Sequence, residues 1–166
     1  MAPADDSEAT PALVEALEIL GQWSEWVPFA NALDMAPRLP GVYMAREGTI
    51  GPLVYVGMAG ERRGSRDRPQ GIRGRLAIYA RGKGLASGLG EAVFDRALAD
   101  VDWLRERVAE VERREAARAK EWGKAAFVRA DLHVRWIVAP DKAAAVMLER
   151  SCLDALASHE LWNRLR

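Results

Sequence analysis

Apolar residues near the start of the chain recur with the period of a helix. Leu13, Leu17 and Leu20 lie four and three residues apart, which predicts a helix that begins near Pro11. Residues 22–40 contain aromatic residues and three prolines without a regular period. We therefore expect an irregular segment there, packed onto the rest of the protein by its aromatic rings.

Short apolar runs further along the chain predict strands. Residues 41–46 and 53–58 flank a turn rich in glycine, and so short a connection favours an antiparallel hairpin. Residues 132–138 form a third run, and helices are expected over 71–82 and 142–157. This order predicts an α+β fold, with a small three-stranded, mainly antiparallel sheet flanked by helices.

A segment between the second and third strands, residues 85–131, is predicted to be mostly helical. After a short first helix, a longer one is expected to follow Asp100 and to end near Trp122. Its apolar seam can pack inside the molecule or bind a partner, so the segment can enlarge the core, hold a substrate or mediate a protein interaction. The seam consists of Val101, Leu104, Val108 and Val111.

Composition indicates one domain without a membrane segment. The chain has 166 residues, 49% of them hydrophobic, which is enough for a core at this size. No apolar run is long enough to span a bilayer, and the N-terminus lacks the pattern of a secretion signal, so a cytoplasmic protein is expected. Cys152 is the only cysteine, and with His133 and His159 as the only histidines a structural zinc site is not expected.

The net charge is zero, but the charges are unevenly distributed. Residues 1–35 hold seven acidic residues and no Lys or Arg, whereas residues 58–84 hold eight basic residues against two acidic ones. A local basic patch can dock a phosphate backbone whatever the total charge, and it can equally be a solvated loop. The basic residues expected to bind nucleic acid are Arg62, Arg63, Arg66, Arg68, Arg73, Arg81 and Lys83.

Two charged residues fall inside apolar helical stripes. Arg75 lies three residues after Ile72 and four before Tyr79, and Glu149 lies four residues after Ala145 in the last predicted helix. A charge in a core-facing stripe is costly unless it is paired or bound to an ion. The two residues can form a salt bridge with each other, or they can line a cleft in which Glu149 holds a cation and Arg75 holds a phosphate.

Several short elements, taken in order, resemble the GIY-YIG nuclease family. Gly41-Val42-Tyr43 resembles the first family element, and Tyr55-Val56-Gly57 resembles the second. The arginine with a tyrosine four residues later is most similar to the family's nuclease domains in bacterial excision repair. The resemblance assigns residues 1–39 to a lead-in and residues 40–166 to the nuclease-like domain, with the helical segment as an insertion. The later matches are Arg75, Tyr79, Glu149 and Asn163.

The resemblance implies a metal-dependent endonuclease that hydrolyses phosphodiester bonds, with DNA as the expected substrate and one Mg²⁺ or Mn²⁺ as cofactor. Glu149 would hold the ion, because a single carboxylate suffices for a cation that keeps several waters. Arg75 would pair with the scissile phosphate through its planar fork. The implied catalytic residues are Tyr43, Tyr55, Arg75, Tyr79, Glu149 and Asn163, with Gly41 and Gly57 as structural residues of the motif.

The roles of the hydroxyl and amide groups follow from the resemblance alone. Tyr43 would deprotonate or position the attacking water, Tyr55 and Tyr79 would hydrogen-bond the phosphate or the nucleophile, and Asn163 would fix the cleft. Each has a structural alternative, because strand tyrosines are often packing residues and an asparagine near a chain end can act as a cap.

One position departs from the family pattern. A Lys or another polar residue often follows the second element, whereas this chain has Met58. This difference leaves open a nucleic-acid-binding module that has lost catalysis. A third interpretation is a protein-interaction domain that works through the insertion.

Overall fold

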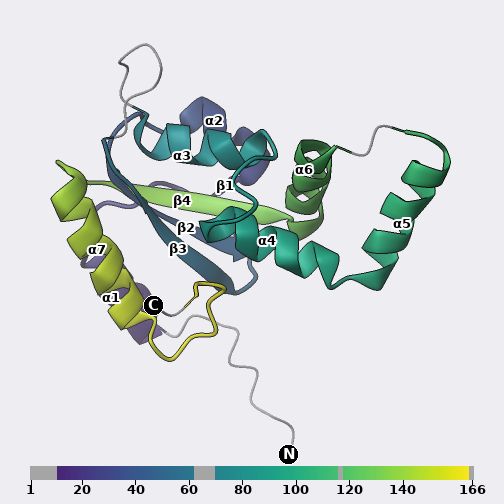
Figure 1. Ribbon diagram of the computed structural model, residues 1–166. Coiled ribbons are helices and arrows are strands. Elements are labelled where there is room, and N and C mark those ends of the chain that lie inside the picture. The colour runs from purple at the N-terminus through teal and green to yellow at the C-terminus, as the bar shows by residue number, and fades with distance from the viewer. Residues whose placement is uncertain (1–10, 62–69, 116–117, 165–166) are drawn as a thin grey trace, which may run out of the picture.

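A four-stranded antiparallel sheet runs through the centre of the protein, in the order β1-β4-β2-β3 (Figure 1). The computed structural model describes residues 11–61, 70–115 and 118–164. The α+β class and the β2–β3 hairpin are confirmed. The strands are β1 (Val27–Pro28), β2 (Gly41–Glu47), β3 (Leu53–Ala59) and β4 (Leu132–Val138).

Helices cover both faces of this sheet (Figure 1). One face carries α1 (Pro11–Glu18) and α7 (Lys142–Ala155). The helix α5 (Val101–Glu112) stands away from the sheet and packs against α4 (Gly88–Leu98). The other face carries η1 (Phe29–Asn31), α2 (Ala32–Met35), α3 (Gly71–Ala80), α4 (Gly88–Leu98) and α6 (Ala119–Ala130).

The sheet has one strand more than the three that we predicted. The additional strand, β1, is two residues long, with Val27 opposite Val134 and Pro28 opposite His133. A run this short, inside a segment with several prolines, cannot show the alternation by which strands are found in a sequence. It ties the irregular lead-in to the edge of the sheet beside β4.

Alternating side chains divide the core into two layers. Tyr43 and Ala45 of β2 face a cluster rich in aromatic residues beneath α3, α4 and α6. Val42 and Met44 face a smaller aliphatic cluster beneath α1 and α7. The period of two in a strand therefore places the tyrosine of the first motif element on the α3 face.

After Asp100 the insertion contains two helices, α5 and α6, where we predicted one long helix. The predicted start is correct, since Asp100 Oδ1 accepts hydrogen bonds from the backbone N–H groups of Asp102 and Trp103, both at 3.1 Å. The prediction of a single helix is wrong, because α5 ends at Glu112 and Arg114 adopts a left-handed backbone with φ of 59°. Because an arginine rarely adopts this conformation, the sequence carried no signal for the break.

Candidate active site

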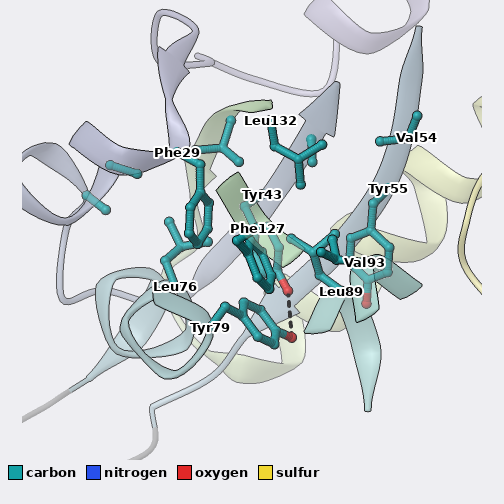
Figure 2. Close-up of a cluster of buried hydrophobic side chains, with 14 of the residues drawn as sticks. Phe29, Tyr43, Val54, Tyr55, Leu76, Tyr79, Leu89, Val93, Phe127 and Leu132 are labelled. Atoms are coloured by element: carbon teal, nitrogen blue, oxygen red, sulfur yellow. Dashed lines mark hydrogen bonds between the residues drawn. The ribbon is translucent and has the colours of Figure 1, made fainter. Parts of the chain in front are cut away.

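All three tyrosines of the chain meet on the α3 face of the sheet (Figure 2). Tyr43 comes from β2, Tyr55 from β3 and Tyr79 from α3. The Tyr43 and Tyr55 rings stack with centroids 6.1 Å apart, and the hydroxyls of Tyr43 and Tyr79 share a hydrogen bond of 3.4 Å. The side chains are buried, so the cluster belongs to the core as well as to the candidate site.

Two glycines leave room for these hydroxyls. Tyr43 lies directly opposite Gly57 in the hairpin, and a Cβ at Gly57 would lie 2.6 Å from the Tyr43 hydroxyl oxygen. A Cβ at Gly88, in the first turn of α4, would lie 2.8 Å from the Tyr79 hydroxyl and 3.1 Å from that of Tyr55. Gly88 was not predicted from the sequence, because nothing distinguishes it from its glycine-rich surroundings.

Gly41 has a packing role of a different kind. A Cβ at this position would collide with the carbonyl oxygen of Ile137 and would lie 2.8 Å from Ile72 Cδ1. The glycine thus allows the first turn of α3 to lie close to the β2–β4 pair.

Burial keeps Tyr43 and Tyr55 protonated. Burial raises the pKa of Tyr43 well above its ordinary value, and the neighbouring Tyr79 and Tyr55 raise that pKa further. Burial also raises the pKa of Tyr55, and Tyr79 and Glu149 add to the increase, whereas Arg75 lowers it. Both hydroxyls are therefore hydrogen-bond donors at neutral pH, which favours a positioning role for Tyr43 over that of a base.

Arg75 and Glu149 lie on α3 and α7, which cover opposite faces of the sheet, and both act electrostatically on Tyr55. Each side chain is half-buried, and the charge of each affects the pKa of Tyr55. Helix α7, which carries Glu149, packs against both β3 and β2. Among the described residues no ion pair joins Arg75 to Glu149, so the salt bridge that the sequence allowed between them does not form.

Asn163 holds the edge strand β3 next to this cluster. The backbone N–H of Val56 donates to Asn163 Oδ1 at 3.0 Å, and Asn163 Nδ2 donates to the Val56 carbonyl at 2.7 Å. The backbone N–H of Trp162 also donates to the Val54 carbonyl at 2.6 Å. These are the bonds that a further strand would make, and they fix the residue between Tyr55 and Gly57.

Further contacts, which the sequence did not reveal, hold this C-terminal segment in place. The Arg96 guanidinium lies 4.2 Å from the centre of the Trp162 ring. Arg164 forms ion pairs with Glu91 at 3.0 Å and with Asp95 at 3.7 Å. Helix α4 of the insertion therefore supports the segment that positions β3.

Met58 does not face the tyrosines. Side chains alternate along β3, and Met58 packs against the aliphatic cluster beneath α1 and α7. A longer polar side chain at this position would begin on the opposite side of the sheet from Tyr43. The departure from the family pattern therefore leaves the tyrosine cluster unchanged.

The predicted nucleic-acid-binding residues are described in part. Arg73 is half-buried on the first turn of α3, and Arg81 and Lys83 are exposed after the helix ends. Four further residues lie outside the described part of the chain, and these are Arg62, Arg63, Arg66 and Arg68.

The residues present fit a hard cation that retains its water. In the described residues, no three His, Cys, Asp or Glu side chains come together as a metal cage. Mg²⁺ commonly uses one or two carboxylates and keeps several waters, which is compatible with Glu149, whose charge raises the pKa of Tyr55, as its one protein ligand. Cys152 is a poor ligand for a metal, because burial raises the pKa of its thiol to about 12.

Comparisons of the whole chain with protein-family models, curated proteins and solved structures gave no match. Within the described residues, no helix combines the length and apolar character needed to cross a membrane.

Proposed function

We propose that this chain is a metal-dependent endonuclease that hydrolyses phosphodiester bonds of DNA, on a GIY-YIG-like scaffold with an inserted helical segment. The observation that carries the proposal is the meeting of all three tyrosines in one cluster, in which the charges of both Arg75 and Glu149 act on Tyr55. These residues come from two strands and two helices that are far apart in the sequence. Packing alone does not require the three tyrosines of the chain to gather where a guanidinium and a carboxylate both act on one of them.

Each group has a distinct task in this proposal. Arg75 binds the scissile phosphate through its fork of N–H donors, and the protonated hydroxyl of Tyr55 donates to a phosphate oxygen or to the attacking water. Tyr43 and Tyr79 hold each other through their shared hydrogen bond and orient Tyr55 by stacking and contact. Asn163 holds β3 so that Tyr55 and Gly57 keep their positions.

Glu149 would hold the divalent ion. A bound Mg²⁺ supplies positive charge that stabilises the phosphate oxygens as the bond breaks. With a single carboxylate assigned to it, the site suits one ion rather than a two-ion clamp. Glu149 itself orients the ion relative to Tyr55, whose pKa its charge raises.

A plasmid-nicking assay tests the proposal. The wild-type protein should nick supercoiled plasmid with Mg²⁺ and should lose this activity when a chelator is added. Glu149→Gln should abolish nicking while the protein remains folded, because the substitution preserves the shape of the side chain, and thermal unfolding checks that the variant is folded. Asp154→Asn removes an exposed carboxylate from the same helix and is the matched control, with activity expected to remain. Undiminished nicking by Glu149→Gln would refute the assigned role.

A binding module without catalysis is the second candidate. Its support is the mutual hydrogen bond between the buried hydroxyls of Tyr43 and Tyr79, since both groups are engaged inside the protein. This candidate predicts binding of DNA that is equal with Mg²⁺ and with chelator, and no nicking under either condition.

The exposed seam of α5 supports a third candidate, a protein-interaction domain. Val101, Val108 and Val111 are 58%, 53% and 47% exposed, so most of the seam does not pack inside the molecule. If the seam joins two copies of the chain, light scattering will give a dimeric mass that Val108→Glu reduces to that of the monomer. A monomeric wild-type protein would contradict self-association through this seam.

A further inference from the structure

The inserted helix α6 lies directly against the end of α3 (Figure 1). A Cβ at Gly82 would collide with the backbone of Lys120 and would lie 3.0 Å from its Cα. A Cβ at Gly123 would lie 2.9 Å from the carbonyl oxygen of Gly82. Glycine at both positions allows the two backbones to touch, so the first turn of α6 continues the surface that begins after α3.

Basic side chains surround this contact. Within residues 118–124 the one acidic residue is Glu121, which lies 3.8 Å from the Lys120 ammonium and 3.4 Å from that of Lys124. One carboxylate shared by two ammonium groups leaves an excess of positive charge, and both lysine side chains remain about half exposed. We call this surface the α3–α6 basic edge, formed by the exposed residues Arg81, Lys83, Arg118, Lys120 and Lys124.

The α3–α6 basic edge continues from the candidate active site. Arg81 follows Arg75 by six residues, which is about 9 Å along a helix axis. One strand of duplex DNA advances about 3.4 Å per phosphate, so this distance corresponds to two or three phosphates. The loop after the edge leads to Gly88, which lies beside the hydroxyls of Tyr55 and Tyr79.

We propose that the α3–α6 basic edge binds the phosphate backbone of duplex DNA to one side of the cleavage position. The insertion thereby lengthens the nucleic-acid interface beyond the residues of the motif. Exposed lysine and arginine side chains contact phosphates without reading bases, so this contact adds affinity rather than sequence specificity. The inference rests on the proposed nuclease function for the position of the cleavage site, but its binding step needs no metal.

Salt-dependent binding of a labelled duplex of random sequence, measured in chelator, tests the edge. Lys83→Gln with Lys120→Gln should weaken binding and reduce the slope of log affinity against log salt by about two, because about 0.9 is lost per phosphate contact. Arg105→Gln with Arg113→Gln is the matched control, since it removes two basic side chains of α5 and its C-terminal end that are 74% and 57% exposed. The control should keep the wild-type slope, and thermal unfolding should confirm that both double variants are folded.

The outcomes separate this inference from the nuclease proposal. A reduced slope for the lysine variant alone supports the edge even if the wild-type protein does not cut plasmid. If the wild-type protein cuts plasmid and the salt slopes of all three proteins are equal, DNA binding by the α3–α6 basic edge is contradicted and the nuclease proposal stands. Equal reductions of the salt slope in the lysine variant and in the α5 control also contradict DNA binding by the α3–α6 basic edge, because they show a general effect of charge. Absence of any duplex binding overturns it as well.

Discussion

Arginines lie on both faces of the sheet, but their surroundings differ. On the α1/α7 face, Arg46 lies 4.4 Å from the centre of the Trp26 ring, and Arg135 lies 4.7 Å from that of Trp23. Arg135 also forms an ion pair of 2.8 Å with Glu18. These guanidinium groups thus stack on indole faces, and they join α1 and the lead-in to the sheet, although the buried Nε atom of each has no hydrogen-bond partner among the described residues.

On the α3 face, Arg75 is placed beside hydroxyl groups instead. Its charge lowers the pKa of both Tyr43 and Tyr55, although burial raises each pKa by more. No carboxylate of the described residues forms an ion pair with Arg75. A guanidinium that no anion holds in place can bind the phosphate of a substrate. A guanidinium stacked on an indole ring cannot do so without losing its contact with the ring. We therefore propose that Arg75 binds substrate, whereas Arg46 and Arg135 are structural.

Among substitutions of the arginines on the two faces, the largest expected effect is on DNA cleavage. Arg75→Ala should reduce plasmid nicking by at least about 100-fold, because it removes the donor pair proposed for the scissile phosphate. Its thermal unfolding should change little, since no ion pair among the described residues is lost. Arg75→Lys should restore only part of the activity, because an ammonium cannot bind two oxygens in the same planar geometry. Wild-type nicking by Arg75→Ala would remove Arg75 from the site.

The opposite result is expected for Arg135→Ala. The substitution removes ring contacts to Trp23 and Trp26 and the ion pair with the half-exposed Glu18, and should lower the free energy of unfolding by about 2 kcal/mol. Nicking by the fraction that remains folded should be normal. Urea denaturation with parallel activity assays checks both expectations. An activity loss without a loss of stability would show that the two faces do not divide their roles in this way.

Much of this arrangement follows from residue periodicity, and the remainder does not. The hairpin, the position of α3 and the cap at Asp100 were predictable because each depends on local sequence. Arg75 and Glu149 were found as charges inside apolar stripes, which is also a local signal. The clamp by Asn163, the contact at Gly88 and the stacking of Arg135 on tryptophan depend on residues brought together only by the tertiary fold.

A smaller effect is expected at the clamp that holds β3. Asn163→Ala removes both hydrogen bonds to Val56 and should lower the free energy of unfolding by about 1–2 kcal/mol. The Val56 amide should then exchange with solvent faster, because its acceptor is lost on an edge strand. Asn163→Asp keeps an acceptor for that amide but loses the donor to the Val56 carbonyl, so exchange should be slower than in the alanine variant. Unchanged exchange in Asn163→Ala would contradict the clamp.

The smallest expected effect is visible only in alkaline solution. Burial raises the pKa of Tyr43 and of Tyr55, so each contributes stability that is fully present below the pKa of the unfolded chain, near pH 10, and is lost as pH rises toward the folded pKa. Because the chain has three tyrosines and all belong to the cluster, tyrosinate absorbance reports this face alone. At pH values where the tyrosines of the urea-unfolded chain are fully ionised, Tyr43 and Tyr55 of the folded protein should still be protonated. Identical titration curves for the folded and unfolded chains would show that the cluster is open to water.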